Sequence, residues 1–157
     1  MSVAVCPGSF DPVTNGHLDV ISRASAMFGS VVIAVAANVA KQPLLTVGQR
    51  VELLQEHTAM WPNVSVAEVP GLLVDFCAEQ GASVIVKGLR SGSDLDDELP
   101  MALMNRHLSG VETVFLPASQ HVTHVASSLV KDIARHGGPI ESLVPGSVAA
   151  AVRAALT

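Results

Sequence analysis

Short apolar runs alternate with amphipathic segments along this 157-residue chain, and no other feature of the sequence constrains the fold more strongly. The runs are rich in valine, which is typical of strands that are covered on both faces. They span residues 3–6, 31–37, 64–69, 83–87 and 112–116. An amphipathic segment follows each run, and this alternation favours a parallel sheet with helices on both faces.

Helices are expected where apolar residues recur at helical spacing and where start and stop signals agree. They span residues 16–28, 72–80, 94–108 and 127–136, with one more opened by the capping box at 46–49 and a last one that starts at Pro145. Pro100 costs about 3 kcal/mol in a helix interior, so a late start or a kink is expected there. The sequence thus predicts a single α/β domain over residues 1–157, Rossmann-like and doubly wound around a five-stranded parallel sheet.

The composition excludes several classes of protein. An apolar fraction of 49% with a charged fraction of 15% excludes disorder, and a net charge of −5 disfavours a nonspecific nucleic-acid surface. No apolar run reaches the roughly 18 residues of a membrane helix, and no basic leader precedes the first strand. The two cysteines, Cys6 and Cys77, have no disulfide or zinc spacing, so a cytoplasmic protein is expected.

Ligands of such sheets bind beyond the carboxyl ends of the strands, which draws attention to the loop at residues 7–17. Thr14 is expected to cap the following helix, and Gly16 would let a ligand approach the helix N-terminus. His17 would lie in the first turn, where it can donate hydrogen bonds to phosphate oxygens. The alternative for His17 is a residue that only hydrogen-bonds its own turn.

Cations follow two other strands at the same edge. Lys87 and Arg90 flank Gly88 after the fourth predicted strand, and this arrangement suits an anionic ligand unless the two are merely solvated. Lys41 follows the second predicted strand and reaches the same edge.

Hydroxyl groups open the helix after the fifth predicted strand. Ser127 and Ser128 either form a second anion site or simply cap that helix. His121 and His124 precede them but lack a third ligand, so no metal site is predicted.

These segments resemble a nucleotidyltransferase superfamily that is marked by a T-x-G-H loop, here residues 14–17, and by an I-S-S-[ST] turn, here 125–128. More narrowly, the chain is similar to the bacterial phosphopantetheine adenylyltransferases. The similarity runs through P-G-S-F-D-P-V-T-N-G-H, K-G-L-R, M-N-R-H-L and S-S-L-V-K-D-I-A-R-H-G-G. It implies a homohexameric transferase of coenzyme A biosynthesis. That enzyme uses Mg²⁺ with ATP to adenylylate 4′-phosphopantetheine, giving dephospho-coenzyme A and pyrophosphate.

The resemblance also implies the residues of the site. The ATP-binding positions would be Ser9, Phe10, His17, Gly88, Leu89, Arg90, Glu98, Val122, Thr123, His124, Val125, Ala126, Ser127 and Ser128. The phosphopantetheine-binding positions would be Ser9, Lys41, Leu73, Lys87, Met104 and Asn105. His17, Lys41 and Arg90 would carry the catalysis. Because the acceptor phosphate is already a nucleophile, positioning and charge stabilisation would suffice without a general base.

Three departures from the family pattern affect phosphate and nucleotide handling. Lys87 replaces the usual arginine, Ala126 replaces a serine, and residues 121–124 lack the expected aromatic side chains.

Two other functions remain open. One is a related T-x-G-H enzyme that acts on nicotinamide mononucleotide or a phosphoalcohol, and the other is a nucleotide sensor that binds ATP but releases no pyrophosphate. The sensor is disfavoured because a pure binder needs no acceptor clamp such as Lys41. The hexamer is expected to bury apolar positions such as Leu99, Met101 and Leu103.

Overall fold

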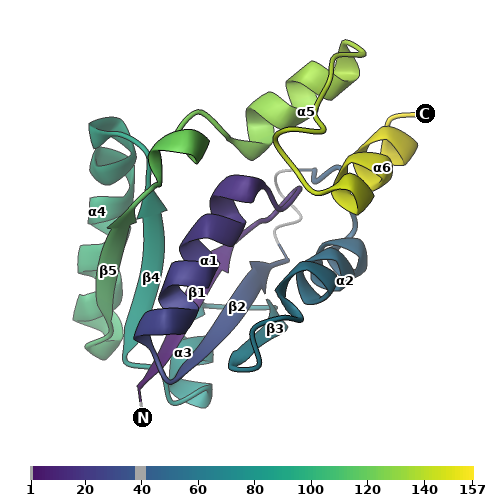
Figure 1. Ribbon diagram of the computed structural model, residues 1–157. Helices are drawn as coiled ribbons and strands as arrows, with labels where there is room; N and C mark the ends of the chain where they lie inside the picture. Colours follow the sequence, from purple (N-terminus) through teal and green to yellow (C-terminus); the bar gives the residue numbers. More distant parts are fainter. Residues whose placement is uncertain (1, 38–41) are drawn as a thin grey trace.

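Five parallel strands form one sheet in the computed structural model, which describes residues 2–37 and 42–157 (Figure 1). They are β1 (Val3–Gly8), β2 (Ser30–Ala36), β3 (Val64–Val69), β4 (Val84–Leu89) and β5 (Glu112–Pro117), in the order β3-β2-β1-β4-β5. All the predicted strands are confirmed. β1 and β4 each continue two residues further at the carboxyl end than the apolar runs indicated.

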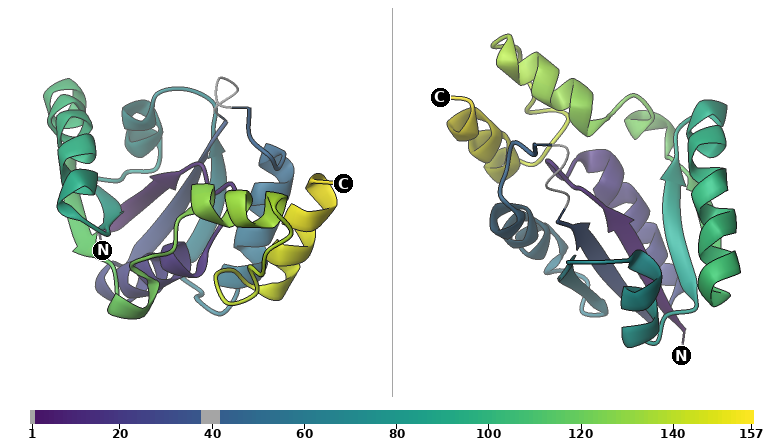
Figure 2. Two further views of the ribbon diagram at one scale, coloured as in Figure 1. Left: turned by 90° about the horizontal axis from the view of Figure 1, so that it is seen from above. Right: turned by 180° about the vertical axis from the view of Figure 1, so that it is seen from behind.

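Helices cover both faces of this sheet, as predicted for a doubly wound fold (Figure 2). The helices of the described residues are α1 (Asn15–Met27), α2 (Val47–Thr58), α3 (Leu73–Glu79), α4 (Gly92–Ser109), α5 (Ser127–Arg135) and α6 (Gly146–Ala155), with a 3-10 turn η2 (Gln120–Val122). On one face, Ala24 of α1 packs with Ala4 and Cys6 of β1. On the other, Phe76 of α3 packs with Val5 of the same strand, because successive strand residues point to opposite faces.

The strand order places a ligand crevice at β1. From β1 the chain first builds β2 and β3 on one side and then returns to build β4 and β5 on the other. Parallel pairing sets Gly8 opposite Val35 and Val5 opposite Ile85, so the carboxyl ends of β1, β2 and β4 share one edge. Such a reversal point is where doubly wound sheets bind ligands. Helices α5 and α6 lie beyond this edge (Figure 1).

The start of α4 was predicted wrongly. The helix begins at Gly92 rather than late, because the Ser91 side chain accepts the Asp94 N–H at 3.3 Å and caps the first turn. It then continues through Pro100 to Ser109. The proline leaves the carbonyl four residues earlier, at Asp96, without its helical donor, but Asp96 is exposed and water can satisfy it.

The start of α6 also differs by one position. Pro145 is the N-cap, and the helix begins at Gly146.

Candidate active site

The loop from β1 to α1 ends in a capping box that contains His17. Thr14 is the N-cap, as predicted, and its hydroxyl accepts the His17 N–H at 3.3 Å. In return, Nδ1 of His17 accepts the Thr14 N–H at 3.0 Å. Histidine here fills the place that glutamate or glutamine usually takes in this motif. The structure therefore confirms the hydrogen bond to the turn that was one of the two readings of His17.

The same contact fixes the state of the imidazole. Because Nδ1 accepts a hydrogen bond, the ring proton of the neutral form lies on Nε2. Burial, followed by the positive charges of Arg90 and Lys87, lowers the pKa of His17 to about 4. His17 is therefore neutral at physiological pH and keeps one N–H that its own turn does not use. It also lines the main cavity, so a role for His17 beyond its own turn stays a prediction.

Two cations lie at the carboxyl end of β4, Lys87 within the strand and Arg90 directly after it. Each has an acidic partner on α4. Lys87 Nζ lies 3.2 Å from Glu98 Oε2, and Arg90 Nε lies 3.5 Å from Asp94 Oδ2. The Arg90 N–H also donates to Asp94 at 2.9 Å. All four are partly exposed, so an anionic ligand can compete for Lys87 and Arg90.

Gly88 lies between these cations because α1 leaves no room for a larger residue. A Cβ at Gly88 would lie 2.8 Å from Cγ2 of Val20. The absence of a side chain thus brings β4 and its cations close to α1. At Gly16, by contrast, a Cβ would meet its neighbours at 3.4 Å or more, so glycine is not forced there by the protein alone.

The N-terminus of α5 faces the same region and has no side-chain cap. Ala126 is the N-cap, and no side chain hydrogen-bonds the first turn. Ser127 Oγ instead donates to the Pro12 carbonyl at 2.8 Å, which ties α5 to the first loop. Plain capping therefore does not explain these serines. The free N–H groups of the first turn are suited to an anion.

These three segments enclose a cavity of about 370 Å³. The residues that line it come from β1 and the first loop, from β4 and α4, and from the segment before α5. They include Cys6, Gly8, Phe10, Thr14, Gly16, His17, Val20, Lys87, Gly88, Arg90, Asp94, Glu98, Val122, Val125, Ala126, Ser127 and Ser128. The convergence of three loops predicted from the sequence is thus present in the structure. Burial raises the pKa of the Cys6 thiol to about 12, so this residue is not a nucleophile at neutral pH.

Two smaller cavities receive Ser9, Leu73 and Asn105, predicted residues that do not line the main cavity. A cavity of about 190 Å³ is lined by Ser9, Phe10, His17 and Ser127, and one of about 40 Å³ is lined by Leu73, Lys87, Glu98 and Asn105. In the smallest cavity, the Thr113 hydroxyl is buried without a hydrogen-bond partner.

Other predicted positions lie outside the cavities. Leu89, Thr123, His124 and Met104 do not line any of the three, and Met104 is exposed. Lys41 lies outside the described residues.

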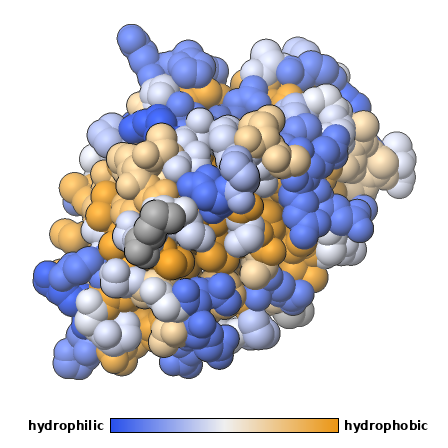
Figure 3. Space-filling model, turned by 60° about the horizontal axis from the view of Figure 1, so that its bottom comes forward, coloured by the Kyte–Doolittle hydropathy of each residue, from blue (hydrophilic) through white to orange (hydrophobic). Residues whose placement is uncertain are grey.

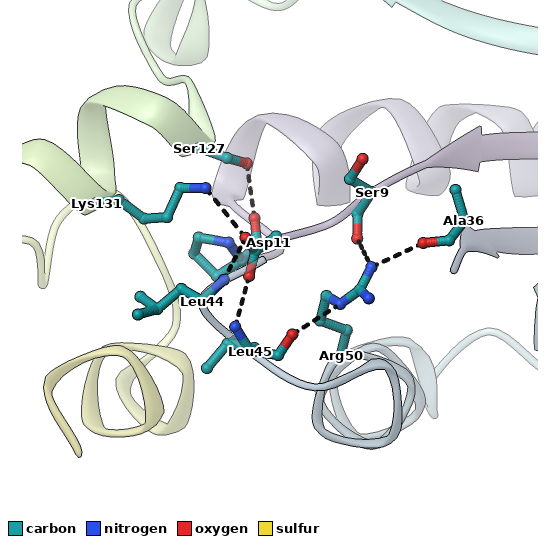
Figure 4. A network of polar contacts seen from close by, with 9 residues as sticks. Ser9, Asp11, Ala36, Leu44, Leu45, Arg50, Ser127 and Lys131 are labelled. Carbon is teal, nitrogen blue, oxygen red and sulfur yellow. Dashed lines mark hydrogen bonds and ion pairs between the residues drawn. The ribbon is translucent and has the colours of Figure 1, made fainter. Parts of the chain in front are cut away.

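Three charged residues that the sequence did not single out border the 190 Å³ cavity. Figure 4 shows Asp11, Arg50 and Lys131 in one polar network with the first loop. Asp11 accepts the Leu44 and Leu45 N–H groups, each at 2.9 Å, and pairs with Lys131 at 3.1 Å. Burial opposes the ionisation of Asp11, but these bonds outweigh it and lower its pKa. The partners of Asp11 lie far from it in the sequence, so residue spacing could not indicate this network.

Within residues 2–37 and 42–157, no three His, Cys, Asp or Glu side chains are placed to hold a metal ion. No helix in those residues is long and apolar enough to cross a membrane.

Comparison with known proteins gives relatives that match nearly the whole chain. The cytidylyltransferase-like family profile matches residues 5–133. A phosphopantetheine adenylyltransferase from a Nocardioides species is 53% identical over 99% of this chain and 98% of the relative. Another, from Bifidobacterium animalis subsp. lactis, is 50% identical over 99% of both chains.

A solved structure from Vibrio parahaemolyticus has the same fold. It is described as a candidate nicotinate-nucleotide adenylyltransferase and superposes with a TM-score of 0.70. The similarity covers 97% of this chain and 92% of that one at 16% identity, which supports the fold alone.

Proposed function

We propose, since the chain belongs to the phosphopantetheine adenylyltransferase family, that it transfers the adenylyl group of ATP to 4′-phosphopantetheine. The products are dephospho-coenzyme A and pyrophosphate, the penultimate step of coenzyme A biosynthesis. The observation that carries this proposal is the cavity into which His17, Lys87 and Arg90 converge from two strand ends.

The reaction is a displacement at the α-phosphorus of ATP. An oxygen of the acceptor phosphate forms a bond to this phosphorus, and the bond to the oxygen that bridges to the β-phosphate breaks. Pyrophosphate leaves with the bonding electron pair. The attacking phosphate is anionic at neutral pH, so the step needs no general base, and catalysis consists of alignment and charge stabilisation.

His17 is the proposed donor to the α-phosphate. Its Nε2–H remains available because the capping bond uses Nδ1, and the neutral ring donates without needing a proton from solvent. Arg90 and Lys87 offset the charge that develops on the phosphates. The uncapped N-terminus of α5, which also lines this cavity, adds backbone N–H groups.

The acceptor is proposed to bind on the side of the smaller cavities. Ser9 and Lys41 would hold its phosphate, and Leu73, Lys87 and Asn105 would line the path of its pantetheine arm together with Met104. Lys87 lines both the main and the smallest cavity, which supports a role for it between the two substrates.

Mg²⁺ is proposed to arrive on the triphosphate rather than on a protein cage. The carboxylates of the main cavity, Asp94 and Glu98, are already paired with Arg90 and Lys87. Oxygen ligands from phosphates suit this ion, and it shields part of their charge. The proposed setting is the cytoplasm.

We further propose a homohexamer, because α4 and β5 present an apolar face. Leu99, Met101 and Leu103 are 42%, 58% and 48% exposed, as the sequence indicated. Apolar residues are exposed on the left of Figure 3, the side on which Figure 1 places α4 and β5. Several exposed apolar side chains on one element mark a contact between proteins.

Pyrophosphate release from ATP tests the function directly. Release that depends on 4′-phosphopantetheine supports the proposal, and nicotinate and nicotinamide mononucleotides serve as competing acceptors. Release with a mononucleotide alone would assign the chain to another substrate. ATP binding without release on any of these acceptors would favour the nucleotide sensor.

A further inference from the structure

Arg50 is a buried arginine whose partners are main-chain oxygens. It lies on α2 with 3% of its surface exposed. Its Nε donates to the Leu45 carbonyl at 3.2 Å, and its Nη1 donates to the Ser9 and Ala36 carbonyls at 2.7 and 3.0 Å (Figure 4). None of the ion pairs found among residues 2–37 and 42–157 includes Arg50.

These three carbonyls belong to three different segments. Ser9 lies in the loop after β1, Ala36 ends β2, and Leu45 precedes the cap of α2. The guanidinium group is planar and its N–H directions are fixed, so one arginine can hold three segments in a set arrangement. Arg50 therefore fixes the main chain of Ser9 against the end of β2.

The charge of Arg50 is not balanced at the neighbouring cavity. The 190 Å³ cavity is lined by three charged residues, Arg50, Asp11 and Lys131. Asp11 and Lys131 form an ion pair with each other, which leaves the positive charge of Arg50 in excess among the described lining. A buried positive charge at a cavity wall favours an anionic ligand more strongly than an exposed one, because water screens it less.

We propose that Arg50 is a positioning residue for the acceptor substrate. It holds Ser9 at the border of the small cavity, and its charge raises the affinity of that cavity for a phosphate group. The cavity also contains His17 in its lining, so a phosphate bound there lies beside the donor that serves the main cavity. This inference rests on the proposed function, since it takes the acceptor to be a phosphorylated molecule.

Two substitutions separate positioning from general stabilisation. Arg50→Lys keeps the charge but has one nitrogen for three carbonyls, and Arg50→Gln keeps two N–H groups without the charge. Thr58→Val is the matched control. Thr58 lies on the same helix, is 3% exposed, and donates its hydroxyl to the Leu54 carbonyl at 2.7 Å without lining any of the three cavities.

Steady-state kinetics with each substrate varied should show a larger effect on the acceptor than on ATP. A lost charge-assisted interaction corresponds to about tenfold in binding. KM for phosphopantetheine should therefore rise about tenfold in Arg50→Lys, which loses the anchoring of Ser9, and about a hundredfold in Arg50→Gln, which loses both the anchoring and the charge. KM for ATP should rise less than KM for phosphopantetheine, because Arg50 does not line the main cavity although Gly8 and Phe10 of the anchored loop do. The control should melt earlier and keep both KM values.

Hydrogen exchange provides a measurement that does not depend on activity. Amides of residues 8–13 should exchange faster in both Arg50 variants than in the wild type and in Thr58→Val. Unchanged acceptor KM in folded Arg50→Lys would overturn the inference, as would an equal rise of both KM values. A wild type that releases no pyrophosphate with phosphopantetheine would reject the proposed function and the acceptor role with it. Unchanged exchange would reject the anchoring of Ser9 whatever the activity.

Discussion

At the scale of single residues, His17 has one ring nitrogen in a helix cap and the other available to a ligand. His17→Ala should therefore lower both the turnover and the free energy of unfolding. Removal of a preorganised donor costs about 10²- to 10³-fold in turnover, while ATP binding should change only a few-fold. Loss of half the capping box should also lower the free energy of unfolding by about 0.5–2 kcal/mol. Turnover, ATP titration and melting on one preparation measure all three.

His17→Gln is the matched variant for this pair of effects. Glutamine closes a capping box from the same position, so the melting temperature should return toward that of the wild type. Turnover should stay low, because the imidazole N–H is absent. If both variants turn over normally per folded molecule, His17 serves only the helix.

The depressed pKa of His17 predicts a dependence of stability on pH. The pKa is about 4 in the folded chain, against an ordinary value of 6.5. Below pH 6.5 the unfolded chain binds a proton that the folded chain does not, so stability should fall as the pH drops from 6.5 toward 4. Urea unfolding at several pH values should show a smaller fall for His17→Gln than for the wild type. Parallel curves would mean that other groups cause the loss.

Lys87 tests the departure from the family pattern. A lysine makes a point-charge contact where arginine can make two parallel hydrogen bonds. Lys87→Arg should therefore keep activity and bind phosphate at least as tightly, whereas Lys87→Ala should be severely impaired. Full turnover in the alanine variant would remove Lys87 from the site. Glu98, its partner at 3.2 Å, should release it when an anion binds.

At the scale of elements, Asp11 joins the first loop to the segment before α2 and to α5. Asp11→Asn should lower the free energy of unfolding by about 1.5–3 kcal/mol, since hydrogen bonds to a charged group are lost. The pKa of Asp11 is lower in the folded chain than its ordinary value of 3.8. The stability that ionised Asp11 adds is therefore present above pH 3.8 and is lost as the pH falls through the folded pKa. Urea unfolding measures the change, and the exposed Asp96→Asn is the control.

The elements were predictable to different degrees, for physical reasons. The valine-rich runs identified all the strands because a buried strand has few other possible sequences. Thr14 was identified as a cap because a side-chain oxygen there acts within three residues. The start of α4 was missed because the penalty of Pro100 was weighed without the cap at Ser91. Arg50 could not be found at all, because its partners are main-chain carbonyls brought together only by the fold.

At the scale of the whole molecule, the exposed apolar face of α4 should decide the assembly. Leu103→Glu places a charge in that face and should shift the proposed hexamer toward smaller species. Met60→Glu is the control, because Met60 is 66% exposed and follows α2 rather than α4. Light scattering at micromolar concentration compares the three proteins. A wild type that is monomeric there would reject the hexamer.

The capping box of α1 links the folding of the chain to its chemistry. The contact that closes the first turn also sets which ring nitrogen of His17 carries the proton. Molecules that fold but fail to close this turn lack the oriented donor, so they should be both rare and inactive. Specific activity should therefore report the folded fraction of a preparation. Activity and circular dichroism should therefore be lost together on heating, and they should recover together on refolding.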